Sequence, residues 1–199
     1  MKQQTLKINF RQKQIIIGKL LGDGHLETAN GKTYRLKIEH SWRQKEYVDW
    51  LYRELTGLVL RPPQPKNQLV NNREYKKYWF NTPYSGSLRF YAGQFYRQGK
   101  KVVPRLIKRW LTPLTLAVWF MDDGSIKSKE CQGKIINTQA FDQQGLKRLL
   151  EALREKYQID ANLRKQKEGK QIYIPAKEVE KLKKAIGHYV LPSMKYKLG

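Results

Sequence analysis

Cysteine and histidine are scarce in this 199-residue chain, which has one cysteine (Cys131) and three histidines (His25, His40 and His188). So few thiol and imidazole groups exclude a disulfide framework, a zinc finger and a His–Cys zinc site. Long apolar runs are missing too, since none approaches the roughly 20 residues that a membrane span needs. The first residues, MKQQTLKINF, lack the apolar core of a signal peptide. The sequence therefore predicts an intracellular protein with no membrane partner.

Acidic residues are also few, because 17 Asp and Glu stand against 40 Lys and Arg, which gives a formal net charge of +23. A folded protein this basic repels itself unless it meets a polyanion. Hydrophobic residues make up 40% of the chain and aromatic residues 12%, enough to build a packed interior. We therefore expect a folded protein that binds nucleic acid.

Two segments of similar character lie half the chain apart. Residues 15–24 (IIIGKLLGDG) and 114–124 (LTLAVWFMDDG) are apolar, and both end in Asp-Gly. Their aspartates, Asp23 and Asp123, are 100 residues apart. Such self-similarity indicates a duplicated unit. We expect an N-terminal half over residues 1–104 and a C-terminal half over residues 105–199, joined in one compact molecule.

Each half is expected to repeat the order helix, strands, helix, strands, helix. Thr112 and Pro113 are typical of a helix start and predict where the second apolar helix begins. Residues 33–40 alternate between apolar and polar, as a half-buried strand does. Apolar residues at helical spacing predict amphipathic helices over residues 45–56 and 144–157. The other expected strands are residues 75–81, 88–92, 134–141, 161–166 and 171–174.

The two Asp-Gly pairs place a carboxylate where a helix does not favour one. Gly24 and Gly124 can each end an apolar helix. The preceding aspartate then lies at the negative end of the helix dipole, at a cost of a few tenths to about 1 kcal/mol. A single Asp-Gly is more often a turn, but two matching copies in a basic chain suggest that a cation compensates both. Carboxylates and helix-terminal carbonyls are hard ligands for Mg²⁺, and paired metals can hydrolyse phosphodiesters.

At these residues the chain resembles the LAGLIDADG homing endonucleases, in the branch where one chain carries both motifs. The motif falls on residues 16–24 and 116–124. The resemblance implies an α+β fold of two pseudo-symmetric αββαββα halves, with the motif helices packed at the centre and antiparallel sheets forming a DNA-binding saddle. Further similarities run through most of the chain, at residues 31–34 (GKTY), 111–124, 137–139 (NTQ), 171–174 (QIYI) and 196–198 (YKL).

The resemblance also implies an active site. Asp23 and Asp123 match the family's last acidic motif residue, while Lys101 and Lys197 match its basic residues near the scissile phosphates. For each lysine, a solvated contact to the phosphate backbone is an equal alternative. The expected catalytic residues are Asp23, Asp123, Lys101 and Lys197, and the expected metal ligands are Asp23, Asp123, Gly22 and Asp122.

The motifs depart from the family pattern at several positions. Leu21 in the first motif and Met121 in the second stand at the earlier acidic position, so only the last acid remains in both. The second motif differs at two further positions. Val118 replaces the motif glycine, so close contact between the helices would depend on Gly18, Gly22 and Ala117. Asp122 replaces a small residue. It could neighbour the metal ligand or act as a group behind it.

The activity implied is site-specific double-strand cleavage of DNA by Mg²⁺-dependent hydrolysis, leaving 5′-phosphate and 3′-hydroxyl ends. Mn²⁺ should substitute for Mg²⁺, and Ca²⁺ should support binding without cleavage. A single chain of two unlike halves should act as a monomer on a long, asymmetric target in double-stranded DNA, since a symmetric dimer would favour a palindrome. The resemblance alone suggests a mitochondrion or chloroplast.

Strands are expected to read the DNA, because an antiparallel ribbon fits the major groove. Within residues 33–40, Leu36, Ile38 and His40 share one face, which would pack on helices, and the other face is polar. About half of the candidates should touch DNA, mostly at phosphate, and any one of them could instead be a solvated charge at a strand edge. The candidates are Arg35, Lys37, Glu39, Arg73, Lys76, Lys77, Arg89, Lys127, Asn137, Gln139, Arg164 and Lys165.

Two other functions fit the same composition. An RNA maturase on this fold would bind intron RNA and would tolerate the loss of either aspartate. A DNA-binding regulator with an inactive nuclease fold would bind without cutting. The presence of both acids weakens these alternatives without excluding them.

Overall fold

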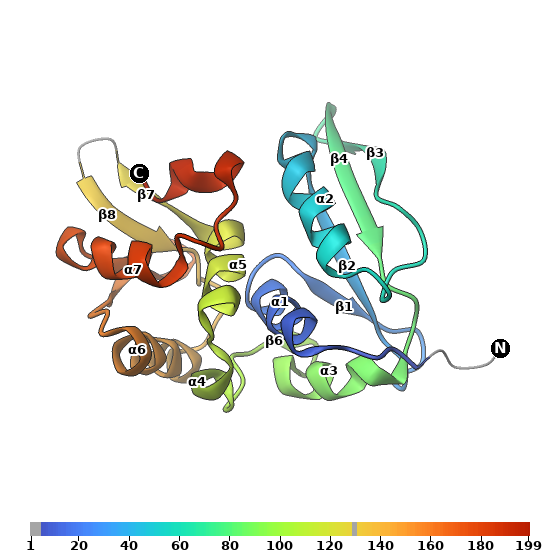
Figure 1. Ribbon diagram of the computed structural model, residues 1–199, viewed down its shortest axis with the longest axis horizontal. Coiled ribbons are helices and arrows are strands. Elements are labelled where there is room, and N and C mark those ends of the chain that lie inside the picture. The colour runs from blue at the N-terminus through green and yellow to red at the C-terminus, as the bar shows by residue number, and fades with distance from the viewer. Residues whose placement is uncertain (1–4, 129–130) are drawn as a thin grey trace.

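The computed structural model describes residues 5–128 and 131–199, and its two halves repeat one chain path (Figure 1). In the N-terminal half the path is helix, two strands, helix, two strands, helix. These elements are α1 (Phe10–Leu21), β1 (His25–Glu27), β2 (Arg35–Ser41), α2 (Lys45–Glu54), β3 (Gln64–Val70), β4 (Arg73–Asn81) and α3 (Arg89–Phe95).

The C-terminal half has the same order of elements. They are α5 (Pro113–Asp123), β7 (Gly124–Ser128), β8 (Cys131–Ile136), α6 (Gln143–Tyr157), β9 (Asn162–Gln166), β10 (Gly169–Ile174) and α7 (Val179–Ile186). Between the halves lie β5 (Tyr96–Arg97), β6 (Lys100–Lys101) and α4 (Ile107–Trp110). Four short 3₁₀ helices are also described, at residues 42–44, 86–88, 176–178 and 192–197.

Matching sheets confirm the expected αββαββα halves. Both are antiparallel and four-stranded, with the order β1-β2-β4-β3 in one and β7-β8-β10-β9 in the other. Each pair of strands in the order of the first sheet has its counterpart in the second. The expected α+β fold is confirmed, while the boundary at residues 104 and 105 stays a prediction.

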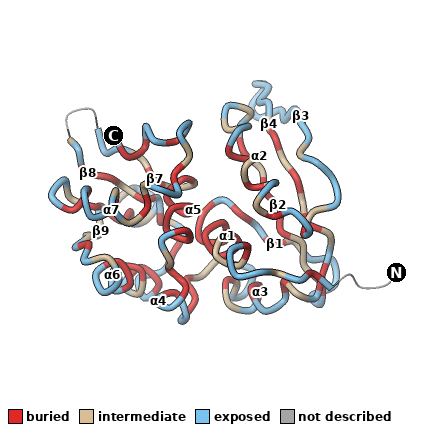
Figure 2. The backbone as a smooth tube through the Cα atoms, in the orientation of Figure 1, coloured by how far each residue is buried: buried red, intermediate tan, exposed pale blue. Residues whose placement is uncertain are grey.

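The two motif helices cross at the centre of the molecule, as expected (Figure 1). Asn9 begins α1 with a capping box that includes Gln12, and Thr112 caps α5 ahead of Pro113. Eight residues of α1 and eight of α5 are buried, so both helices are covered on most sides. Figure 2 shows this burial concentrated where the halves meet. The crossing therefore joins the two halves into one core.

The strand predicted over residues 88–92 is wrong, because this segment turns into α3. Leu88, Tyr91, Ala92 and Phe95 are buried, which is the i, i+3, i+4, i+7 spacing of a helix face. A short aromatic segment suits either structure locally, and packing decided for the helix. Arg89, expected near a strand, lies on this helix with its side chain exposed.

The strand predicted over residues 134–141 begins earlier and ends earlier, as β8 at Cys131–Ile136. Asn137 and Gln139 consequently lie beyond its end. The side chain of Thr138 donates to the Lys170 carbonyl at 2.8 Å, so the chain leaves the ladder there. The alternation of apolar and polar residues is weak in this segment, so the sequence does not mark where the strand ends. The pairing of β8 with β10 sets that end instead.

Candidate functional site

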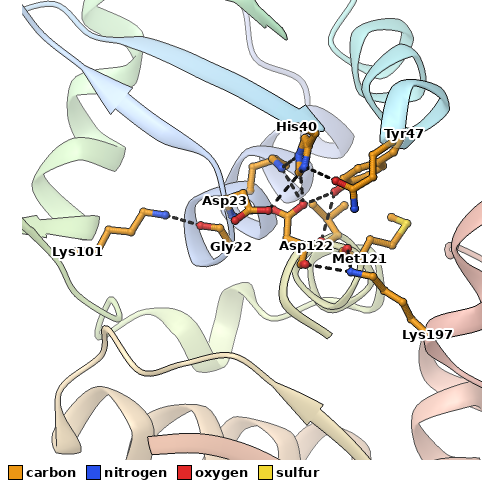
Figure 3. Close-up of polar contacts among 11 residues, drawn as sticks. Gly22, Asp23, His40, Tyr47, Lys101, Met121, Asp122 and Lys197 are labelled. Atoms are coloured by element: carbon orange, nitrogen blue, oxygen red, sulfur yellow. Dashed lines mark hydrogen bonds and ion pairs between the residues drawn. The ribbon is translucent and has the colours of Figure 1, made fainter. Parts of the chain in front are cut away.

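The C-terminal ends of α1 and α5 meet where the two Asp-Gly pairs lie (Figure 3). The backbone N–H of Asp23 donates to Asp122 Oδ2 at 2.9 Å. A Cβ placed on Gly22 would lie 2.6 Å from the Asp122 Cβ, closer than real side chains come. Glycine at residue 22 is what lets the two helix ends touch.

A buried polar cluster supports this junction from the N-terminal half. The side chains of Lys19 and Asp122 are fully buried, and the Lys19 ammonium donates to Asp122 Oδ1 at 2.8 Å. The Tyr47 hydroxyl donates to the same oxygen at 2.9 Å. His40 Nε2 lies 2.7 Å from the Lys19 ammonium. Burial, and then the charge of Lys19, lower the pKa of His40 to about 3, so its ring is neutral.

Sequence reasoning missed Lys19 and Tyr47, and it placed His40 only on a buried strand face. A lysine inside the apolar run IIIGKLL was an available signal, because a charge at a core position needs a partner. The partner, Asp122, follows 103 residues later. No local pattern identifies that pairing.

Lys101 and Lys197 occupy corresponding places, one at each helix end (Figure 3). Lys101 donates to the Gly22 carbonyl at 2.5 Å. Lys197 donates to the carbonyls of Met121 and, at 3.0 Å, Asp122. Burial lowers the pKa of each lysine, with Asp122 opposing the shift most in both cases. Each ammonium therefore lies at the negative end of a motif helix, where a cation is stabilising.

Asp123 carries the strongest sign of unbalanced negative charge. Burial, followed by the nearby Asp122 and Asp23 carboxylates, raises the pKa of Asp123 to about 8, against the opposing effect of Lys101 and Lys19. Within residues 5–128 and 131–199, no side chain donates a hydrogen bond to this carboxylate. A divalent cation would reverse this shift, because it favours the ionised form.

Two sets of side chains at this centre could supply ligand atoms to a hard cation, and one set fits better than the other. Asp23, His40 and Asp122 each offer a ligand atom within 4.8 Å of the others. However, Asp122 and His40 already bond to Lys19. Asp23 has a side chain 50% exposed, and it lies close enough to Asp123 to raise the pKa of that carboxyl. Among residues 5–128 and 131–199, the Asp23 and Asp123 carboxylates accept no hydrogen bond from another group, unlike the Asp122 carboxylate.

The raised pKa of Asp123 predicts how the stability of the metal-free protein depends on pH. A carboxyl whose folded pKa exceeds its unfolded value stabilises the fold at low pH and loses that contribution as pH rises, here between about 4 and about 8. Asp123→Asn should therefore raise Tm relative to the original chain by about 4 °C or more at pH 8.5, and by much less at pH 5. Thermal unfolding in EDTA measures both. Asp160→Asn, at an exposed carboxyl, is the matched control and should show no such pH dependence; an equal response from the two variants would contradict the charge assignment at Asp123.

The outer face of the first sheet carries most of the basic residues expected there. Buried and partly buried residues alternate along β2, and Arg35, Lys37 and Glu39 lie opposite the buried residues. Cross-strand pairs of Lys37 with Asn81, and of Ser41 with Lys77, bring β4 residues onto the same face. Arg73 shares it, four residues from Lys77 along β4.

Lys76 and Lys77 lie on opposite faces of this sheet, because neighbours in a strand alternate. The Lys76 ammonium lies 3.9 Å from the centre of the Trp42 ring, on the face that carries Tyr78 and Phe80. Lys77 instead faces outward, opposite Lys66. The sequence grouped the two lysines by proximity along the chain, and the strand separates them.

The second sheet shows the same division. Arg164 pairs with Gln171 on the face of Tyr173, and the Lys127 ammonium lies 5.3 Å from the Tyr173 ring centre. Lys165 pairs with Lys170 on the other face, which carries the buried Ile172. Arg164 and Lys127 are thus the better placed of the expected basic residues.

Asn137 and Gln139 lie past β8 yet differ in their surroundings. The Asn137 N–H donates to the Asp123 carbonyl at 3.0 Å, and its side chain accepts from Gln171 at 2.7 Å. Asn137 therefore joins the end of α5 to the second sheet. Gln139 packs its backbone against Gly169, where a Cβ would lie 3.0 Å from the Gln139 Cα.

A cavity of about 470 Å³ links the acidic centre to the first sheet. Its lining includes Asp23, the sheet residues Lys37, Glu39 and Lys77, and His25 at the start of β1. A phosphate backbone that follows the basic face would reach the Asp23 carboxylate through this space. Among the described residues, no helix is long and apolar enough to cross a membrane.

Known proteins show the same combination of sequence and fold. The model of the LAGLIDADG DNA endonuclease family matches residues 13–182. DNA endonuclease I-ChuI of Chlamydomonas applanata is 31% identical, over 98% of this chain and 97% of its own length. The solved structure of the homing endonuclease I-WcaI bound to its DNA recognition sequence superposes with a TM-score of 0.90 at 26% identity, covering 98% of this chain and 88% of that one.

A third relative carries a different name. Cytochrome b mRNA maturase bI2 of Saccharomyces cerevisiae is 33% identical over 96% of this chain, which spans 48% of the maturase. The relatives, the matched residues and the pair of motif helices agree with one another. The resemblance stated from the motifs is confirmed, and the chain belongs to the LAGLIDADG DNA endonuclease family.

Proposed function

We propose that this protein is a homing endonuclease that makes a site-specific double-strand break in DNA by metal-dependent phosphodiester hydrolysis. One observation supports the proposal most: the ends of two apolar helices, one from each half, gather Asp23, Asp122 and Asp123 so closely that burial and the other two carboxylates raise the pKa of Asp123 to about 8, against the opposing charges of Lys101 and Lys19. A structural role would not require this accumulation of negative charge. A role in holding cations against phosphate does.

Asp23 and Asp123 are the residues that would hold Mg²⁺, with the carbonyl of Gly22 close by. When bound, the metal supplies Lewis-acid stabilisation of the phosphate and a water of lowered pKa. Lys101 and Lys197 lie at the helix ends, and their ammonium groups would offset charge that develops on the scissile phosphates. The expected products are 5′-phosphate and 3′-hydroxyl ends.

The two sheets would follow the DNA on either side of this centre. Their outer faces offer side chains suited to phosphate, namely Arg73 and Lys77 in one half and Lys127 and Arg164 in the other. Because the halves differ in sequence, the chain would act as a monomer on a long, asymmetric target. A gene for such a protein would be carried by an intron, in an organelle.

A plasmid-library cleavage assay tests the function. The protein should linearise a subset of randomised plasmids with Mg²⁺ or Mn²⁺, and sequencing of the cut ends should give one long target. With Ca²⁺ it should bind that target and leave it intact. Binding without cleavage in Mg²⁺ across the library would leave only a DNA-binding protein.

A second function is favoured by the similarity to the yeast maturase. In that case the basic surface would bind intron RNA and promote splicing, and loss of Asp23 or Asp123 would have little effect. An in vitro splicing assay with an intron-containing RNA, run beside the cleavage assay, separates the two activities. Salt dependence does not, because any protein with several phosphate contacts loses affinity steeply as salt rises.

A further inference from the structure

We propose that Asp122 is a positioning residue that orients Asp23 across the junction of the two halves and leaves Asp123 without an equivalent support. The two DNA strands are then cut by centres that are held unequally. The inference rests on the proposed endonuclease function for one of its two measurements. The contacts on which it rests are formed between residues of the protein and do not involve DNA or a metal ion.

Asp122 holds the backbone of Asp23. Asp23 lies two residues beyond the end of α1, where the helix no longer constrains it. Its N–H donates to Asp122 Oδ2, while Asp122 Oδ1 accepts from Lys19 and Tyr47. Three donors therefore fix the plane of one fully buried carboxylate. Such charge-assisted bonds are short and directional, so Asp23 cannot shift without breaking one.

His40 lies beside the side chain of Asp23, whose backbone is held by Asp122. The Lys19 ammonium can only donate, so His40 Nε2, at 2.7 Å from it, must accept. The ring hydrogen is then on Nδ1. This nitrogen lies 3.1 Å from Gln44 Oε1 and 3.7 Å from Asp23 Oδ2. Asp122 thus holds the N–H of Asp23 while the His40 ring lies against its carboxylate.

Within residues 105–128 and 131–199, the second half has no such arrangement. At the 100-residue offset, Trp119 stands where the first half has Lys19, and Gly22 stands where the second has Asp122. A glycine offers no carboxylate to Asp123, and the close approach of the helix ends forbids a side chain there. Asp123 is instead the last residue of α5. A carboxylate from the opposite helix therefore holds the backbone of Asp23 but not that of Asp123.

The contacts favour a positioning role for Asp122 over direct metal binding. Both of its oxygens already accept hydrogen bonds, and its side chain is fully buried. A ligand would have to give up the Lys19 ammonium, leaving a buried charge without its partner. Replacing a residue that hydrogen-bonds to a metal ligand commonly lowers metal affinity or activity about 10–100-fold.

The main test variant is Lys19→Leu/Asp122→Ala, which replaces both members of the buried ion pair by apolar side chains. Replacing a buried ion pair by apolar residues is often neutral for stability, so this variant should fold. Amide hydrogen exchange is the first measurement. The Asp23 N–H should exchange about tenfold faster or more, while the Asp123 N–H is unchanged.

Strand-specific cleavage is the second measurement, on a plasmid carrying the target. The variant should accumulate a nicked circle, because one strand is cut about 10–100-fold more slowly while the other changes by less than about twofold. Target affinity in Ca²⁺ should stay the same. Arg11→Met, which breaks an exposed pair with Glu54 at the opposite end of α1, is the control and should leave both measurements unchanged.

Several results would overturn the inference. One such result is an unchanged ratio of the cleavage rates of the two strands, whether both are slowed equally or neither is slowed. Another is an Asp23 amide that exchanges as fast as in the original chain. If the double variant fails to fold, Asp122→Asn, which keeps the size of the side chain, is measured in the same two assays. An original chain that cuts no DNA would refute the proposed function, and the exchange measurement would then decide the inference by itself.

Discussion

Asp23→Asn and Asp123→Asn are each expected to lower double-strand cleavage by about 1000-fold or more. A bound divalent ion stabilises the transition state by several kcal/mol, and each 1.36 kcal/mol is a factor of ten in rate. An amide keeps the size of the carboxylate but removes the charge that holds the cation. The measurement is the rate of plasmid linearisation in Mg²⁺ with excess protein.

The same variants should bind the target in Ca²⁺ almost as before, because neither side chain lies on the outer faces of the sheets. Asp49→Asn, which alters an exposed ion pair on α2, is the matched control and should cut normally. Normal cleavage by either active-site variant would remove the metal site from the mechanism. Loss of target binding together with cleavage would point instead to a folding defect.

Gly18→Ala and Gly93→Ala are expected to change stability in opposite directions. A Cβ at Gly18 would lie 2.7 Å from the Val118 Cβ and 2.8 Å from the Thr115 carbonyl oxygen, so the crossing of the motif helices would have to open. Overpacking of this kind costs about 1–3 kcal/mol, or more where backbone is involved. Gly93, within α3, has nothing within 4 Å of its Cβ position, and alanine there should stabilise the helix by about 1 kcal/mol.

Thermal unfolding should therefore show Tm lowered by about 5 °C or more for Gly18→Ala and raised by about 2–4 °C for Gly93→Ala. Adding Val118→Gly to Gly18→Ala should recover part of the loss, because it removes one of the two close contacts and leaves the Thr115 carbonyl. Similar changes in Tm at both glycines would mean that the helix crossing is not tight. Cleavage by Gly18→Ala should fall as well, since the crossing sets the spacing of the two carboxylates.

Residues 33–40 illustrate what could be read locally. Their alternation predicted a strand with His40 on the packed face, and His40 is 4% exposed. The faces of β4 were harder to predict from the sequence. Lys76 and Lys77 are neighbours in the chain, and their placement on opposite faces depends on the register of β4 with β2 and β3. At residues 88–92 a short aromatic run fitted both structures, and only the packing of Leu88 and Phe95 selected a helix.

The sequence by itself determined the positive charge, the duplicated apolar helices and the two aspartates at their ends, because charge and periodicity are properties of neighbouring residues. Only the tertiary structure decided that Lys19 pairs with Asp122 and that Asp122 holds Asp23. Those contacts join residues about 100 positions apart, and they exist because α1 crosses α5 at Gly18 and Gly22. A crossing between distant helices leaves no periodic trace in either segment, so the one-sided support of the active site appears only when the two halves are packed together.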